Sequence, residues 1–187
     1  MGKELAIQLI NIANLNIGRD KVQQQFIERS QNERLTRDEG ELTHLAVFVM
    51  AIDIDTKKVY VGHHKKSGRW IPHGGHVNEG ELVEEALERE IWEEWEMKLK
   101  AKDIGKPELV TITEIENPNQ WKVCKTHYDI WYFVSVKESE FVIDPEILHD
   151  EFYEAKWVDL SEARILVGNT PSVQEALELV ETKYFIQ

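Results

Sequence analysis

The segment from Gly75 to Met97 constrains the fold of this chain more than any other stretch of its sequence. Within it, Glu90, Glu93 and Glu94 follow the i, i+3 and i+4 spacing that places side chains on one face of an α-helix. An apolar stripe adjoins this acidic face and is formed by Val83, Leu87 and Ile91. The segment therefore predicts an amphipathic helix whose buried side borders a row of carboxylates.

The crowded carboxylates indicate a site for a divalent cation. Like charges on one helix face repel by roughly 0.2–0.5 kcal/mol per pair, so helix stability gives no reason to gather them. Hard cations take oxygen ligands, and Mg²⁺ is usually held by one or two carboxylates with waters and substrate phosphates. Arg89 is the only cation between Glu79 and Met97, and it can hold one carboxylate while leaving the others for metal. A solvated acidic face is the alternative interpretation.

The loop before this helix has features that suit a ligand site. Adjacent Gly74 and Gly75 permit backbone conformations that bring carbonyls or amides close to a ligand. Asn78, followed three residues later by Glu81, matches a capping box, which predicts that the helix starts near residue 79.

Together these residues resemble the signature of the Nudix hydrolase family. The match consists of Gly75, then Glu81 after five residues, then, after seven more, the run Arg89-Glu90-Ile91-Trp92-Glu93-Glu94. The family pattern has glycine two residues after the last glutamate, where this chain has Glu96, followed by the expected apolar residue Met97. A non-glycine residue at a left-handed helix end costs roughly 1 kcal/mol or lets the helix continue. The departure concerns the end of the helix and not the metal site.

The resemblance implies a fold and an activity. The fold is α/β of the α+β type, a mixed β-sheet flanked by helices. The activity is cleavage of the diphosphate bond of a nucleoside diphosphate linked to another moiety, such as a nucleoside triphosphate or a nucleotide sugar. The cofactor is Mg²⁺ or Mn²⁺, whose charge assists the attack of water on phosphorus.

The resemblance also implies roles for individual residues. The metal ligands are Glu90, Glu94, Glu93 and the carbonyl of Gly74. The catalytic set contains Glu90, Glu93 as a further ligand or weak base, Arg89 orienting the carboxylates, and Glu81 bracing Arg89. Many members of the family draw one more carboxylate from a loop outside this signature, which we call the Nudix box (residues 75–97). The candidates here are Glu138, Glu140, Asp144 and Glu146.

Basic and aromatic residues around the glycine loop are candidates for substrate binding. Lys65 and Arg69 can meet phosphate, with a plain solvated turn as the alternative. Trp70 can stack on a base, although packing near a sheet end is the commoner role of tryptophan. His76 can hydrogen-bond the leaving group or orient the loop.

Three residues farther along the chain have weaker signals. His127 and Asp129 can approach the site from a neighbouring strand, but a structural pair at a strand start is the favoured interpretation. Cys124 is expected to be an ordinary core or surface residue, because nothing nearby forms an obvious nucleophilic dyad.

Two other functions are compatible with parts of the pattern. An isopentenyl diphosphate isomerase uses a related box but relies on a cysteine near its glycine loop, whereas Cys124 lies well after the box. A catalytically silent Nudix-like sensor or scaffold would normally show eroded box glutamates, and all of them are present here.

The amino-acid composition limits the kinds of molecule that the protein is expected to bind and where it is expected to be located. With a formal net charge of −13, broad contact with a nucleic-acid polymer is not expected, whereas a small metal-chelated phosphate ester is compatible. A single cysteine rules out an internal disulfide framework. The sequence has no apolar run of the roughly 18 residues that span a bilayer and no signal-peptide pattern, so we expect no membrane association and a cytoplasmic location.

The 187 residues divide into an N-terminal helical extension, 1–41, and a catalytic domain, 42–187. Apolar periodicity predicts helices at 3–15 and 20–34. Their apolar stripes must pack against either the catalytic domain itself or a second subunit, and a homodimer is the favoured interpretation. Downstream, the pattern predicts these elements: strands 45–53, 59–63, 109–116, 128–137 and 156–160, turns at 54–58 and Pro118-Asn119, and a terminal helix 172–183.

Overall fold

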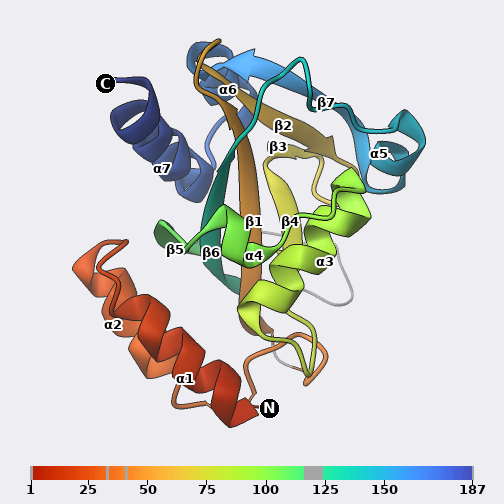
Figure 1. The fold of residues 1–187 in the computed structure, drawn as a ribbon. Coiled ribbons are helices and arrows are strands. Elements are labelled where there is room, and N and C mark those ends of the chain that lie inside the picture. Colours follow the sequence, from red (N-terminus) through yellow and green to blue (C-terminus); the bar gives the residue numbers. More distant parts are fainter. Residues whose placement is uncertain (1, 33, 41, 116–123, 187) are drawn as a thin grey trace.

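The computed structural model of the protein describes residues 2–32, 34–40, 42–115 and 124–186 (Figure 1). Within these residues the centre is a seven-stranded mixed sheet of order β3-β2-β1-β6-β5, in which β4 also pairs with β1 and β7 with β2. The strands are β1 (Thr43–Asp53), β2 (Lys58–His64), β3 (Arg69–Ile71), β4 (His73–His76), β5 (Leu109–Glu114), β6 (Thr126–Ser135) and β7 (Phe152–Asp159). The expected mixed sheet flanked by helices is confirmed.

Helices cover both faces of this sheet (Figure 1). One face carries α1, α2 and α3, whose apolar residues share a core cluster, and the other carries α6 and α7 with a second cluster. The helices are α1 (Gly2–Ala13), α2 (Asp20–Arg29), α3 (Val83–Trp95), α4 (Ala101–Ile104), α5 (Pro145–Glu151), α6 (Leu160–Val167) and α7 (Pro171–Val180), which continues as a π-helical turn, Glu181–Phe185. None of these described helices has the length and apolar character needed to cross a membrane.

Strand β1 is the central element, and its sequence explains why. It is rich in β-branched and other apolar residues and almost wholly buried, as expected for a strand covered on both faces. It pairs in parallel with β6 along its length. Its other edge is shared, because β2 pairs near Ile52 and β4 pairs from Ala46 to Val49. This change of partner places β4, with the two glycines, beside the centre of the sheet.

The N-terminal helices share a hydrophobic core with the strands and helices that follow them. Leu5, Leu9 and Phe26 are buried in the cluster that also contains Val47 of β1 and Leu87 of α3. The side-chain oxygen of Gln8 accepts a hydrogen bond of 2.9 Å from the backbone N–H of Val83, at the start of α3. The apolar stripes that favoured a homodimer are therefore covered within one chain, and they give no argument for a second subunit.

The expected start of the box helix was wrong. The Glu81 carboxylate does accept from the backbone N–H of Asn78 over 2.9 Å, but this bond closes a turn before the helix. α3 begins at Val83, where the Glu85 carboxylate accepts from the N–H of Leu82 over 2.8 Å. Because Asn78 and Glu81 fold back on each other as a turn, both stay close to the glycine loop.

At its other end, α3 ends at Trp95, and Glu96 adopts the left-handed conformation with φ +50° and ψ +24°. The chain therefore keeps the helix end that a glycine would allow, at a cost of roughly 1 kcal/mol for the side chain.

Other boundaries differ modestly from expectation. The second N-terminal helix ends at Arg29, and the strand expected at 156–160 begins at Phe152 because β7 pairs with β2. β6 begins and ends two residues earlier than expected. Residue 116 and the turn at Pro118-Asn119 lie outside the described residues. Five elements were not expected from the sequence: β3, β4, α4, α5 and α6.

Candidate active site

The side chains of β4 alternate between the two faces of the sheet. His73 and Gly75 pair with Val49 and Val47 of β1, whose side chains enter the core beneath α3. Residues opposite each other in a ladder share a face, so His73 and Gly75 also face α3. Gly74 and His76 face the other way. One short strand therefore presents the glycine loop to the α3 carboxylates and a histidine to the opposite face.

Glu94 is buried beneath the loop. Its Oε2 accepts from the backbone N–H of Gly74 over 2.8 Å and lies 3.0 Å from Nδ1 of His73. Burial raises the pKa of the Glu94 carboxyl well above its usual value, and the negative charge of Glu151 adds to this effect. Burial also lowers the pKa of His73 to about 3, so this imidazole is neutral at physiological pH. The ionised form of Glu94 therefore needs additional positive charge nearby.

Glu90 lies one helical turn away, and its carboxylate rests against the α-carbon of Gly75. Burial, together with the negative charge of Glu94, raises the pKa of Glu90 to about 7, although Arg89 acts in the opposite direction. Two adjacent carboxylates are thus held in a protein environment that opposes their ionisation.

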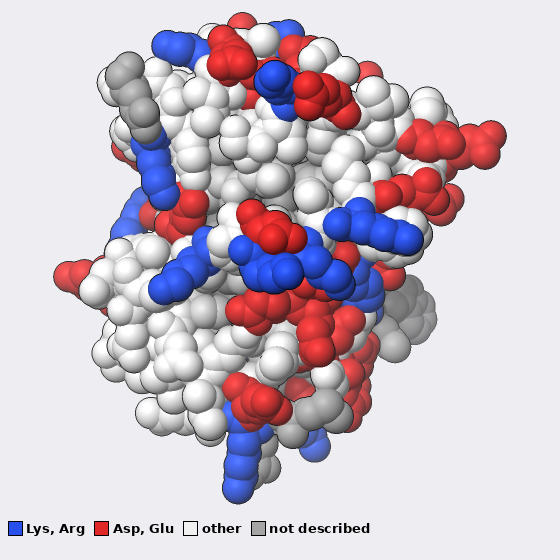
Figure 2. All heavy atoms as spheres, in the orientation of Figure 1, with Lys and Arg blue, Asp and Glu red and all other residues white. Residues whose placement is uncertain are grey.

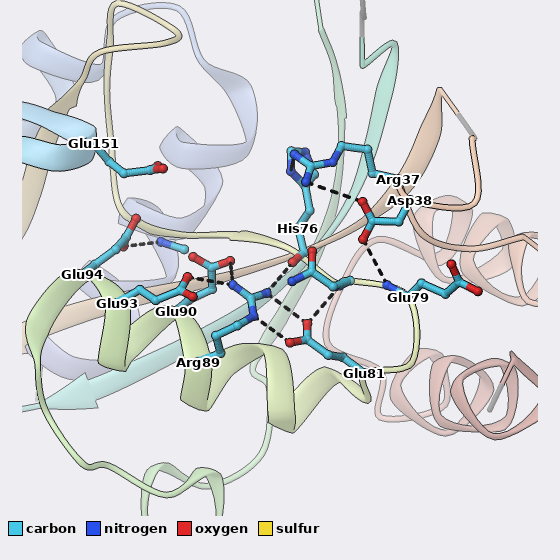
Figure 3. Close-up of polar contacts among 12 residues, drawn as sticks. Arg37, Asp38, His76, Glu79, Glu81, Arg89, Glu90, Glu93, Glu94 and Glu151 are labelled. Carbon is cyan, nitrogen blue, oxygen red and sulfur yellow. Dashed lines mark hydrogen bonds and ion pairs between the residues drawn. The ribbon is translucent and has the colours of Figure 1, made fainter.

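Arg89 forms ion pairs with three carboxylates of the box (Figure 3). Its Nε and Nη2 bind the two oxygens of Glu81 over 2.6 and 3.0 Å in a bidentate pair. Its Nη1 contacts Glu90 at 2.7 Å and Glu93 at 2.9 Å, and Nη2 also donates to the backbone oxygen of His76 over 2.9 Å. One guanidinium therefore fixes the carboxylates of α3 relative to the end of β4.

A pocket of about 490 Å³ opens over these groups. Glu93, whose side chain is 54% exposed, points its carboxylate toward it from α3. The described residues that line the pocket are Arg37, Lys66, Gly74, Gly75, His76, Asn78, Arg89, Glu90, Glu93, Glu94, Ile147, Asp150, Glu151 and Phe152. Cations and carboxylates thus share one cavity, as a metal-chelated phosphate ester would require.

The structure places the expected substrate-binding residues in different surroundings. His76 lines the pocket, but Lys65, Arg69 and Trp70 are not among the described residues that do. The ammonium of Lys65 bonds to the carbonyl of His149. Trp70 stacks on the ring of His63, with centroids 5.4 Å apart, as in the packing alternative. From this region, the basic residue that does line the pocket is Lys66, which directly follows Lys65.

The carboxylate opposite Glu94 comes from an element that sequence reasoning missed. Glu151, the last residue of α5, lines the pocket on the other side from Glu94 (Figure 3). It bonds Lys66 at 2.7 Å and His64 at 3.4 Å. The hydrogen bond from His64 and the pairing with Lys66 lower the pKa of Glu151 to about 2. An Asp144-Pro145 pair, which caps and starts α5, was a usable signal for this helix.

The four carboxylates proposed from the sequence lie elsewhere among the described residues. Glu138 pairs with Lys58 over 2.7 Å, and Asp144 accepts from the N–H of Glu146 as the N-cap of α5. None of the four belongs to the described lining of the pocket; they are Glu138, Glu140, Asp144 and Glu146.

His127 and Asp129 do not pair with each other. Nε2 of His127 lies 3.1 Å from Nε2 of His76. Asp129 accepts from the hydroxyl of Thr111 over 3.0 Å, and burial raises the pKa of Asp129 to about 7. His127 thus meets β4, whereas Asp129 binds β5 within the sheet.

The residues around the pocket fit a hard divalent cation. Glu90 and Glu94 supply oxygen donors that burial disfavours as anions, and a cation would offset that cost. The close approach of Glu90 to Gly75 leaves the carboxylate beside the backbone of the loop, where a carbonyl can share the same ion. Glu93 and Glu151 add further oxygens at the pocket wall.

Comparison with known proteins gives a consistent result. A model of the NUDIX domain matches residues 42–180. Among solved structures, the chain is similar to the dihydroneopterin triphosphate pyrophosphohydrolase of E. coli, with TM-score 0.60 and 21% identity over 75% of this chain and 94% of that one. It is similar to a MutT NUDIX hydrolase from Burkholderia pseudomallei, with TM-score 0.55 and 20% identity over 75% and 99%. The comparison with curated proteins gives no match.

Proposed function

This chain belongs to the NUDIX family, and from that premise we propose that it is a divalent-metal-dependent hydrolase acting on a nucleoside diphosphate linked to another moiety. The bond cleaved is the diphosphate bond, and a nucleoside triphosphate or a nucleotide sugar is the substrate class. The observation that carries the proposal is the pair of buried carboxylates, Glu90 and Glu94, facing a glycine loop and a pocket that also contains cations.

The residues that would hold Mg²⁺ or Mn²⁺ are Glu90, Glu94, Glu93 and the carbonyl of Gly74. Glu151 is a further candidate from the opposite wall, in place of the loop carboxylates proposed from the sequence. When bound, the ion supplies Lewis acidity toward phosphate oxygens and lowers the pKa of a coordinated water.

Side chains of the protein itself position the carboxylates, accept the proton and bind the substrate phosphates. Arg89 holds Glu90 and Glu93 at fixed positions, and the bidentate pair with Glu81 prevents the guanidinium from rotating. Glu93 is the most exposed of the three box carboxylates, so we assign it the proton of the attacking water. Lys66 and Arg37, at the pocket wall, provide positive charge for the substrate phosphates.

The proposed function implies a small-molecule ligand and not a nucleic-acid polymer. A pocket of about 490 Å³ suits a small nucleotide-type molecule. On the face shown in Figure 2, basic side chains are interleaved with acidic ones across the middle of the molecule, which does not favour a nucleic-acid polymer. The division into an extension, 1–41, and a catalytic domain, 42–187, a cytoplasmic location and a homodimer stay predictions from the sequence.

A substrate panel tests the proposal. Phosphate or diphosphate release is measured with Mg²⁺ and with Mn²⁺ for nucleoside triphosphates, nucleotide sugars, dinucleoside polyphosphates and oxidised nucleotides. We expect metal-dependent turnover of at least one class, and we expect Glu90→Gln to lower it by roughly 100-fold or more, to a residual rate that can still be measured. Tight nucleotide binding without any turnover would instead support a silent sensor.

A further inference from the structure

Three histidines and the single cysteine of the chain meet beside the end of β4. Their ligand atoms all lie within 4.8 Å of one another, one from each of His44, His76, Cys124 and His127. Nε2 of His76 lies 3.1 Å from Nε2 of His127 and 3.7 Å from Sγ of Cys124. The His44 ring lies 4.5 Å from the His76 ring and 4.9 Å from the His127 ring, between centroids.

The ligand atoms of this cluster lie on the other side of β4 from the α3 carboxylates, although His76 also lines the pocket. His76 pairs with Ala46 across the ladder, so its ring faces away from α3, whereas Gly75 faces α3. His44 and His127 are register partners on β1 and β6. Figure 3 shows the ring of His76 pointing away from Glu90 and Glu94 and toward Arg37. Three neighbouring strands thus converge on one point at the other side of the glycine loop.

We propose that His44, His76, Cys124 and His127 form a tetrahedral site for a transition-metal ion, with Zn²⁺ the best match. Imidazole nitrogen and thiolate are the donors that Zn²⁺ prefers, and Mg²⁺ or Mn²⁺ prefer oxygen. One cysteine with three histidines gives four ligands, the number that a structural Zn²⁺ site uses.

The distances between the ligand atoms agree with that geometry. Bonds of about 2.0–2.1 Å to nitrogen and 2.3 Å to sulfur, at tetrahedral angles, separate two nitrogens by about 3.4 Å and a nitrogen from sulfur by about 3.6 Å. The His76–His127 and His76–Cys124 distances of 3.1 and 3.7 Å are close to these values. The other separations stay below 4.8 Å, so small rotations of the side chains complete the shell.

The contact between Arg37 and His76 must change for the ion to bind. Nη1 of Arg37 lies 3.3 Å from Nδ1 of His76. A metal on Nε2 of that ring requires the ring proton on Nδ1, which Arg37 cannot accept. The Arg37 side chain is 52% exposed, so it can turn into solvent.

The consequence for the protein is structural. An ion held by β1, β4 and β6 would fix the end of the strand that carries Gly74 and Gly75. The backbone oxygen of His76 is also bonded to Arg89, so the same residue joins this cluster to the box. Because the site needs no substrate, it stands independently of the proposed hydrolysis, and its tests use no activity measurement.

Cobalt titration of the full chain is the first test. Tetrahedral Co²⁺ with a cysteine ligand gives strong visible d–d bands and a thiolate-to-metal charge-transfer band, and we expect both at one equivalent, with Zn²⁺ abolishing them. Cys124→Ser should remove the charge-transfer band, and His127→Gln should weaken binding by more than about 100-fold. The matched controls, His149→Gln at an exposed histidine of α5 and Glu93→Gln in the box, should keep the spectrum.

The second test uses the unmodified protein and does not depend on how variants fold. Cys124 is the only thiol, so reaction with a thiol reagent reports on it alone. Stoichiometric Zn²⁺ should slow that reaction at least tenfold, and excess Mg²⁺ should not. Equal rates with and without Zn²⁺, or a cobalt spectrum that lacks the thiolate band, would overturn the site.

Discussion

A Cβ on Gly75 would lie 2.4 Å from Oε1 of Glu90, closer than Cβ atoms approach non-bonded heavy atoms in real proteins. The glycine is therefore required by the position of one carboxylate. Unlike Gly74, with φ +131°, Gly75 has no left-handed backbone conformation that would itself exclude a side chain. The requirement links the first residue of the Nudix signature, by direct contact, to the helix that carries its carboxylates.

Gly75→Ala should therefore displace Glu90 and impair catalysis without unfolding the protein. A misplacement of about 1 Å can cost on the order of 100-fold in rate, and we expect a fall of roughly 10- to 100-fold in kcat. The check is a double-mutant cycle with Glu90→Gln. If Gly75→Ala lowers activity equally in the wild-type and Glu90→Gln backgrounds, the two residues are not coupled.

Arg89→Lys should raise the Mg²⁺ concentration needed for half-maximal activity by roughly 10- to 100-fold, the usual cost of losing an outer-shell partner. Lysine keeps the charge but cannot make the bidentate pair with Glu81 while also contacting Glu90 and Glu93. The measurement is a metal titration at saturating substrate. Arg164→Lys, at an ion pair with Glu181 on the helices of the opposite face, is the matched control and should leave the titration unchanged.

Asp53 gives a pH-dependent contribution to stability that does not involve metal. Its carboxylate accepts from the backbone N–H of Glu138 over 2.8 Å and of Thr56 over 3.0 Å, and these bonds lower the pKa of Asp53 below its usual value. The stabilisation is thus present above the unfolded-state pKa, 3.8, and lost as pH falls through the lower folded-state pKa.

Asp53→Asn should accordingly cost about 1–2 kcal/mol of unfolding free energy at neutral pH, with the difference shrinking in acid. Urea unfolding of both proteins across the pH range measures it. A penalty that grows as pH falls would have the wrong sign for this account.

Leu9→Ala should lower the unfolding free energy by about 2–5 kcal/mol, because Leu9 is fully buried in the core shared with α3. Ile7→Ala on the same helix is the control, since Ile7 is 59% exposed, and should change stability by less than about 0.5 kcal/mol. If the helix instead formed a dimer interface, the loss at Leu9 would vary with protein concentration.

Much of the fold follows from sequence patterns, and the exceptions share a cause. β1 and α3 have strong apolar periodicity, so their existence was predictable. β4, His-Gly-Gly-His, has no strand propensity and is a strand only because β1 offers it an edge. The partner of the N-terminal stripes was likewise not predictable, since periodicity identifies a buried face but not what packs against it. Tertiary contacts decided both.

The candidate site shows the same division. Fixed spacing along one helix and one loop was enough to predict Glu81, Arg89 and the box carboxylates as site residues. Glu151 is far from them in sequence and enters the pocket through the β2–β7 pairing, where Phe152 lies opposite His64. No local pattern encodes that approach. The choice between Lys65 and Lys66 likewise depends on how the turn after β2 is oriented.

The most direct test of the central claim compares wild type with Glu94→Gln in metal-dependent hydrolysis of the best substrate from the panel. Glu94 is buried and its charge is disfavoured by burial, so the neutral, isosteric glutamine should leave the melting temperature unchanged or raise it. Loss of the carboxylate charge proposed to bind the metal should reduce kcat by about 10³-fold or more, or roughly 4 kcal/mol of transition-state stabilisation. Near wild-type turnover of a folded Glu94→Gln protein at saturating Mg²⁺ would contradict the assignment.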